Sequence, residues 1–60
     1  RTMNIMKNYR LLIEYKVPNT AETYYEESFI QSRYSPAHIC DQYVAQDRED
    51  LIRSVEVSPL

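Results

Sequence analysis

The side chains best suited to chemistry in this 60-residue chain are one imidazole and one thiol, His38 and Cys40. A thiolate–imidazole pair requires the two groups to lie within hydrogen-bond reach, but residues two apart on a helix point in different directions. Cys40 also falls on an apolar stripe, where a cysteine behaves as a small hydrophobic residue. We therefore expect no catalytic residue in this chain and no enzyme activity.

Cofactor and metal sites are expected to be absent as well. His38 and Asp41 would share a helix face, but two ligands are too few for a metal site. The chain has no glycine, which excludes glycine-dependent phosphate loops and dinucleotide fingerprints. Carboxylate catalysis needs a pocket that separates the pKa values of two acids. We interpret the acidic runs at residues 26–27 and 47–50 as solvated charge.

Tyrosine is the most informative residue type, since six tyrosines accompany one phenylalanine and no tryptophan. A tyrosine side chain suits a surface that is wet when free and buried when bound. Three tyrosines are expected to lie partly in the core: Tyr9, Tyr15 and Tyr43. One helix could not cover the remaining three, and two glutamates supply a polar rim to them. The predicted interaction residues are Tyr24, Tyr25, Tyr34, Glu26 and Glu27. The alternative is that these tyrosines pack around the edge of a thin core.

Length and composition favour a single domain that needs a partner. A chain of 60 residues buries only about 60% of its unfolded surface, and such domains rely on disulfides, metals or oligomers. A lone cysteine cannot form an internal disulfide. We therefore expect a homo-oligomer or a domain that docks onto a larger protein. Residues 1–6 are expected to be a cloning remnant or a weakly ordered lead-in, and residues 7–60 the domain.

Charge and hydropathy restrict the partner and the compartment. Seven basic and nine acidic residues give a net charge of −2, and the basic residues are scattered, which argues against nucleic acid as the partner. No apolar run approaches the roughly 18 residues that a transmembrane helix needs. A single thiol suits a reducing compartment. We expect a cytoplasmic protein.

Three segments have a strand pattern. Residues 9–17 alternate between apolar and charged side chains, with Leu12 the one exception, as in a strand with one buried face. Proline and asparagine at residues 18–20 predict a turn. Residues 24–32 form a second candidate strand with weaker alternation. The tail, residues 51–60, is predicted to be the final strand, since residues 53–57 alternate and Pro59 closes it.

A helix is predicted from Pro36 to about residue 46. Ser35 can accept a hydrogen bond from a free backbone N–H, and proline is favoured at the first helical position. The apolar stripe of this helix comprises Ile39, Cys40, Tyr43 and Val44. The predicted fold is therefore α+β, a small three-stranded sheet in β-β-α-β order with one helix packed on one face. The first strand is central, and the second and third are edges.

A three-helix bundle is the alternative fold. Residues 20–28 resemble the second half of a LisH dimerisation motif, although their spacing from Tyr15 is shorter than that motif has. Residues 40–44, with 51–52 and 58–59, are similar to half of a saposin-like domain, a family held by several disulfides. The first resemblance implies a helical dimer and the second a helical bundle.

The function favoured by these features is a non-enzymatic protein–protein interaction module. It would be a small inhibitor or adaptor of the kind found in phages and plasmids, binding through a tyrosine-rich sheet face or a strand edge. One alternative is a nucleic-acid-binding domain that stacks bases on tyrosines, with phosphate contacts from Arg10, Lys16, Arg33 and Arg53. Another is an accessory subunit of a larger enzyme.

Overall fold

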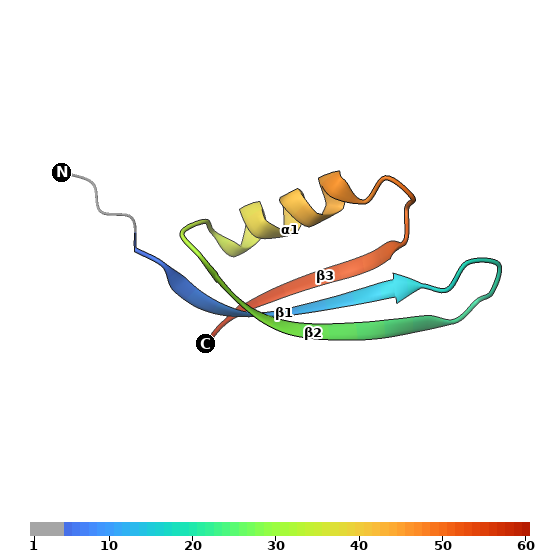
Figure 1. Ribbon diagram of the computed structural model, residues 1–60, viewed down its shortest axis with the longest axis horizontal. Coiled ribbons are helices and arrows are strands. Elements are labelled where there is room, and N and C mark those ends of the chain that lie inside the picture. Colours follow the sequence, from blue (N-terminus) through green and yellow to red (C-terminus); the bar gives the residue numbers. More distant parts are fainter. Residues whose placement is uncertain (1–4) are drawn as a thin grey trace.

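The structure, a computed structural model, describes residues 5–60. Its elements are β1 (Lys7–Lys16), β2 (Thr23–Ser32), α1 (Pro36–Gln46) and β3 (Ile52–Pro59). The three strands form one sheet in the order β2-β1-β3, and both pairings are antiparallel. Helix α1 lies along one side of this sheet (Figure 1). The predicted β-β-α-β fold, with the first strand in the centre, is confirmed.

The core is small and is built mainly on β1. Its alternation places Tyr9, Leu11 and Ile13 on the helix side of the sheet, where each is at most 4% exposed. Ile39 of α1 is buried as well, at 3% exposed, where the helix packs against β3. These four are the buried hydrophobic residues of the described chain, so the domain rests on very little apolar material.

Helix α1 begins and ends as its sequence predicts. The Ser35 hydroxyl accepts a hydrogen bond from the His38 backbone N–H at 3.2 Å, and Pro36 occupies the first turn. Of the predicted apolar stripe, Ile39 is buried and Cys40 and Tyr43 are half-buried. The fourth member, Val44, is 58% exposed. The expectation that Val44 packs with the rest of the stripe was wrong, because α1 packs against the edge strand β3 and not over the whole sheet.

Most strand ends lie one or two residues away from their predicted positions. β1 begins at Lys7 rather than at Tyr9, and residue 17 lies outside it. β3 spans Ile52–Pro59, within the predicted tail 51–60 and ending at the predicted Pro59. The three-helix alternative is not supported, because the segments it requires to be helical form strands. The predicted lead-in falls on residues 1–4, which lie outside the described residues, and on two exposed residues before β1.

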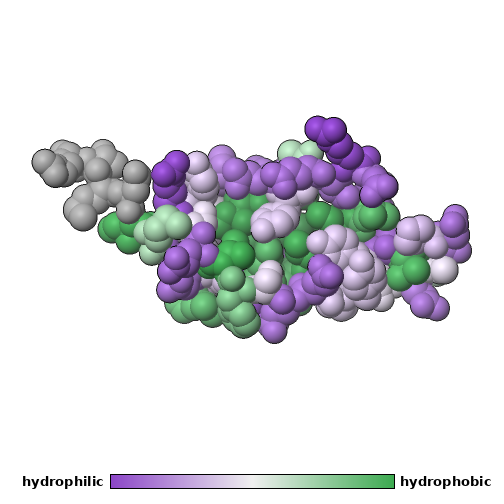
Figure 2. Space-filling view, in the orientation of Figure 1, coloured by the Kyte–Doolittle hydropathy of each residue, from purple (hydrophilic) through white to green (hydrophobic). Residues whose placement is uncertain are grey.

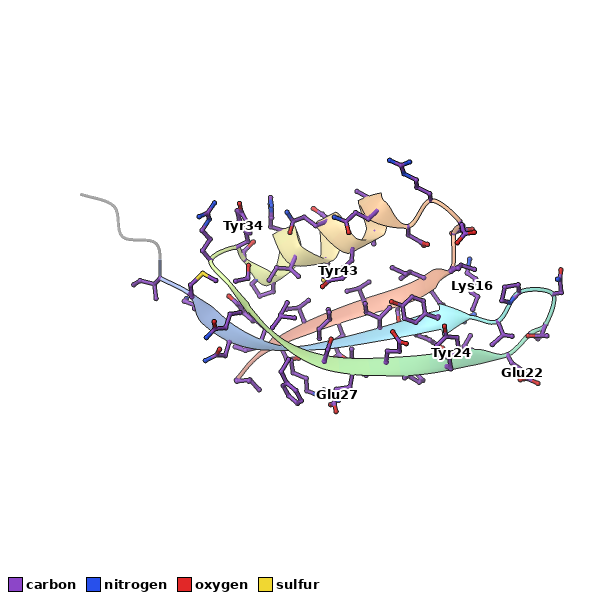
Figure 3. All side chains as sticks on the ribbon, in the orientation of Figure 1. Lys16, Glu22, Tyr24, Glu27, Tyr34 and Tyr43 are labelled. Carbon is purple, nitrogen blue, oxygen red and sulfur yellow. The ribbon has the colours of Figure 1, made fainter. Side chains whose placement is uncertain are left out.

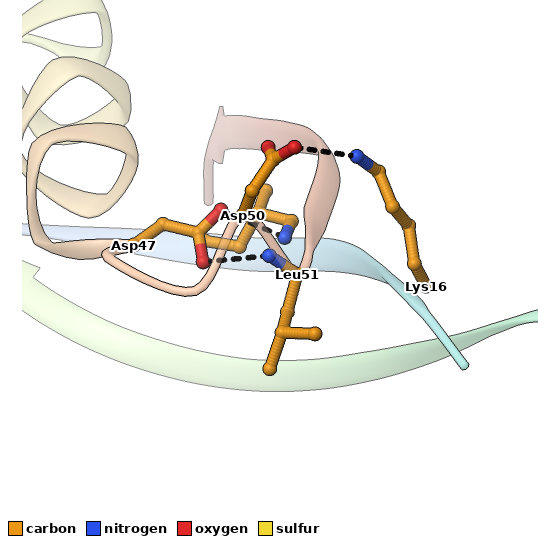
Figure 4. Close-up of polar contacts among 5 residues, drawn as sticks. Lys16, Asp47, Asp50 and Leu51 are labelled. Atoms are coloured by element: carbon orange, nitrogen blue, oxygen red, sulfur yellow. Dashed lines mark hydrogen bonds and ion pairs between the residues drawn. The ribbon is translucent and has the colours of Figure 1, made fainter. Parts of the chain in front are cut away.

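Asp47 connects the end of α1 to the start of β3 (Figure 4). Its carboxylate accepts hydrogen bonds from the backbone N–H groups of Leu51 at 2.9 Å and Ile52 at 2.8 Å. The neighbouring Asp50 has a φ of 55°, a left-handed conformation that aspartate tolerates better than most residues. Its carboxylate contacts the Lys16 ammonium at 3.3 Å. Asp47 thus fixes where β3 starts, whereas Asp50 makes an exposed ion pair.

Replacing Asp47 by alanine is expected to lower the free energy of unfolding by about 1–3 kcal/mol, because two backbone donors lose a charged acceptor. The matched control is Asp50→Asn, which removes the exposed ion pair and tolerates the same backbone conformation. We expect it to cost less than about 0.5 kcal/mol. Urea unfolding followed by circular dichroism measures both, and equal losses would contradict the distinct role of Asp47.

Candidate interaction surface

Strand β2 is an edge strand that the helix does not cover. Its burial differs from that of β1, because no residue of Thr23–Ser32 is buried and most are exposed. The reason is the position of α1. The helix contacts β3, the strand at the opposite edge of the sheet, and lies farthest from β2 (Figure 1). Figure 2 shows apolar surface along the middle of the molecule, between the helix and β2. Both faces of β2 are therefore open to solvent.

The outer edge of β2 carries unpaired backbone groups. In an antiparallel ladder, the N–H and C=O of one residue point to the same side, and successive residues alternate. The Val17 N–H donates to the Glu22 carbonyl at 3.0 Å, and the Lys16 N–H donates to the Leu51 carbonyl at 2.7 Å. Odd residues of β1 therefore pair with even residues of β2. The residues whose backbone groups point outward are Thr23, Tyr25, Glu27, Phe29 and Gln31.

The same five residues place their side chains on the open face of the sheet, opposite α1. Tyr25 is 61% and Phe29 64% exposed. Glu27 lies between them and forms an ion pair with the Arg10 guanidinium of β1. This pair raises the pKa of Arg10 above its ordinary value, first through the hydrogen bond from its side chain to Glu27. Two exposed aromatic rings therefore flank a paired charge along one free edge.

The helix side of β2 carries a second aromatic pair. Tyr24 lies opposite Tyr15 in the register, and their rings stack with centroids 5.3 Å apart. Figure 3 shows Tyr24 on the helix side of β2 and Glu27 on the opposite side. Glu26 and Ser28 continue this face and are exposed. Tyr24 keeps 48% of its surface exposed, so the stack holds the ring in place without burying it.

A third aromatic cluster lies at the connection from β2 to α1. The rings of Tyr34 and His38 stack with centroids 4.5 Å apart, and the Arg33 guanidinium lies 5.2 Å from the Tyr34 ring centroid. The Tyr9 hydroxyl donates to the Tyr34 backbone carbonyl at 3.2 Å. This cluster therefore anchors the connection to the core strand.

The structure distributes the five predicted interaction residues over three places. All five are exposed. Tyr25 and Glu27 lie together on the open face, Tyr24 and Glu26 lie on the helix side, and Tyr34 lies at the α1 connection. Four of the five therefore belong to β2, two on each face, and all four lie next to its free edge.

Sequence reasoning did not select Phe29, although it is one of the most exposed apolar residues in the described chain. A usable signal was present, because Tyr25, Glu27 and Phe29 have the same parity in an extended segment. That parity alone places both rings on one face of β2, with the glutamate between them.

The other edge of the sheet is protected. Strand β3 contains a register shift opposite Glu14 and Tyr15, which is typical of a β-bulge, and it ends in Pro59. Helix α1 also lies against this strand, and the Cys40 thiol donates to the Val55 carbonyl at 3.7 Å. Bulges, prolines and covering elements are the common means by which proteins block strand edges. β2 has none of the three.

Residues 5–60 show no surface pocket and no cluster of three or more side chains able to hold a metal ion. Within the same part of the chain, no helix is long and apolar enough to cross a membrane. Comparison with protein-family models, curated proteins and solved structures gives no match for this chain.

Tyr15 is expected to make the stability of the domain depend on pH in the alkaline range. Its pKa is raised from the ordinary 10.0, first by burial of the phenol and then by the negative charge of Glu26. Because the folded pKa is higher than the unfolded one, the contribution of Tyr15 to stability is complete below the unfolded pKa. It is lost as the pH rises through the folded pKa.

We expect Tyr15→Phe to make the decline of unfolding free energy between about pH 9 and pH 11 shallower than in the wild type. Tyr25→Phe, at an exposed tyrosine on the open face, is the matched control and should follow the wild-type curve. The measurement is the urea midpoint of the wild type and of both variants across this pH range. A Tyr15→Phe curve parallel to that of the wild type would contradict the assignment.

Proposed function

We propose that this chain is a non-enzymatic protein–protein interaction module that binds a partner by strand addition along β2. The observation that carries the proposal is a ten-residue edge strand that is exposed on both faces. An extended partner segment would receive hydrogen bonds from the outward backbone groups of β2, which is the usual source of affinity in this mode of recognition. Side chains on the two faces would provide specificity.

The side chains of β2 suit such a role. Tyrosine and phenylalanine are enriched in interface cores, where they bury much area at little cost in side-chain freedom. Tyr25 and Phe29 would lie beside the added strand on one face, and Tyr24 on the other. The Tyr24 ring is already held by Tyr15, so less side-chain entropy is lost when a partner binds.

The nucleic-acid alternative is weakened by the positions of its basic residues. Three of the four candidate phosphate contacts have a carboxylate neighbour: Arg10 lies beside Glu27, Lys16 beside Asp50, and Arg53 beside Glu14. A phosphate would have to compete with these carboxylates, and the net charge of −2 opposes its approach. We therefore retain the protein-binding proposal.

The role of an inhibitor or adaptor fits a module of this kind, since its effect would come from occupying a strand of a larger protein. An accessory subunit of an enzyme would bind its partner in the same way. The single free thiol, Cys40, supports a reducing compartment such as the cytoplasm.

The test is a selection of random peptides, long enough to pair with the whole of β2, on the immobilised chain. Selected peptides are expected to shift the amide resonances of the five outward residues. Their binding should be lost in Glu27→Pro, which removes an outward N–H, and retained in His38→Ala, which alters the α1 connection only. Binding that survives Glu27→Pro, or a selection that yields no binders, would overturn the proposal.

A further inference from the structure

We propose that the strand added to β2 is β2 of a second copy of this chain, in an antiparallel dimer whose two-fold axis passes through Glu27. This inference rests on the proposed function, because it uses the same edge and names its occupant. The dimer would have one six-stranded sheet in the order β3-β1-β2-β2-β1-β3. Both helices would lie on the same face of this sheet, since a two-fold axis perpendicular to the sheet maps each face onto itself.

The chain exposes more surface than a compact monomer of its mass. The surface of the chain is 4919 Å², whereas a compact monomer of 7.2 kDa exposes about 4,100 Å². The difference is at most about 800 Å², since the larger figure counts every residue of the chain. A standard interface takes about 800 Å² from each partner.

The sequence of β2 is complementary to itself in one register. When Glu27 faces Glu27 of the second copy, Tyr25 lies opposite Phe29 and Phe29 opposite Tyr25. On the helix side, Tyr24 then lies opposite Ile30. Aromatic pairs and pairs of aromatic with β-branched residues are among the most stabilising cross-strand contacts. Each apolar side chain of the strand thereby meets an apolar partner.

Other registers lose this match. A shift of the axis by one residue sets Tyr25 or Phe29 against Glu27 of the second copy. A shift by two places one of these rings opposite a residue outside β2, which spans Thr23–Ser32. The two central glutamates carry like charges, a cost in any strand pair. Here each is already paired with Arg10 of its own chain, so the centre would hold two positive and two negative groups.

The fold also explains why pairing would stop at two copies. After β2 joins β2, the outer edges of the sheet are the two β3 strands. These carry the bulge opposite Tyr15, the terminal Pro59 and the cover of α1. Such edges resist further pairing, and an interface that uses the same surface on both copies is closed. The expected product is a dimer rather than a fibre.

The first experiment measures mass by size-exclusion chromatography with light scattering over a range of protein concentrations. The wild type is expected to approach twice the 7.2 kDa chain mass. Glu27→Pro should raise the dimer Kd by about thirtyfold or more, because two symmetric backbone hydrogen bonds at the centre are lost. Glu27→Gln is the matched control, since it also loses the Arg10 ion pair but keeps the N–H. It should dimerise at least as well as the wild type.

The second experiment tests the register. Tyr25→Lys and Phe29→Glu should each raise the dimer Kd by about tenfold, since each removes two aromatic contacts in the symmetric pair. The double variant should recover most of this loss, because each new lysine lies opposite a new glutamate of the second copy. Within one chain the two positions are four residues apart on a strand, too far to contact each other.

A monomer at every concentration would overturn the dimer, while peptide binding sensitive to Glu27→Pro would leave the proposed function standing. A dimer that is insensitive to Glu27→Pro would overturn this dimer, because it would use another surface, whereas the proposed function would still be decided by the peptide selection. A double variant that dimerises no better than its single parents would overturn the register centred on Glu27. Circular dichroism of each variant confirms that the compared chains are folded.

Discussion

Leu11→Ala is expected to leave most molecules unfolded in dilute solution at room temperature. Leu11 is the largest fully buried side chain and is 2% exposed. Truncating a buried leucine costs about 2–5 kcal/mol, whereas a domain of this size has about 3–5 kcal/mol of stability from one core. With four buried hydrophobic residues in the part of the chain that the structure describes, little other material can fill the cavity. The measurement is a urea titration followed by far-UV circular dichroism.

The matched control for this prediction is Leu12→Ala. Leu12 is the next residue on β1 and lies opposite Glu27 and Glu56 on the open face, where it is only half-buried. We expect this variant to lose less than about 1.5 kcal/mol, since less area leaves water and no closed cavity forms. If Leu12→Ala were as damaging as Leu11→Ala, the core would not lie on the helix side of β1.

The second large effect is expected from proline at Ser28. The Ser28 N–H points toward β1, so Ser28→Pro removes a ladder hydrogen bond and leaves the Leu11 carbonyl without its donor in the core. The combined cost is about 2–4 kcal/mol, enough to unfold most of a marginal domain. Glu27→Pro, one residue away, has its N–H on the free edge, where proline is tolerated.

These two proline variants differ only in which side of β2 loses a donor. At low protein concentration, thermal unfolding should show Ser28→Pro far less stable than the wild type and Glu27→Pro within about 1 kcal/mol of it. The reverse order would show that odd residues of β2 face β1. That result would remove the basis of both the strand-addition proposal and the dimer.

The secondary-structure elements were predictable where a single physical cause sets the sequence pattern, either burial of one strand face or a local helix-start signal. Along β1, alternate side chains face a core and solvent, so Tyr9, Leu11 and Ile13 specify a strand by themselves. The helix was predictable at its start because Ser35 and Pro36 are local start signals, independent of tertiary contacts. Local chemistry and burial agree in both segments.

The interaction surface was only partly predictable. The weak alternation of β2 reflects exposure on both faces, which depends on α1 lying over β3 rather than over the whole sheet. The local sequence of residues 24–32 carries no signal for the position of the helix. The tyrosines of this segment were therefore recognised as surplus to the core, but their division between two faces required the register of Tyr24 opposite Tyr15. The exposure of Val44 was not predictable for the same reason, since the choice of strands that lie beneath a helix is a tertiary property.

Amide hydrogen exchange along β2, measured by NMR at increasing protein concentration, tests the central claim most directly. In dilute solution, the even residues 24–30 should be protected by β1, and the outward amides of Thr23, Tyr25, Glu27, Phe29 and Gln31 should exchange freely. As concentration rises, we expect the outward amides to become protected, with Glu27 at the centre of the protected stretch. Outward amides that exchange freely at every concentration, while protection grows elsewhere on the chain, would contradict the assignment of the β2 edge as the binding surface.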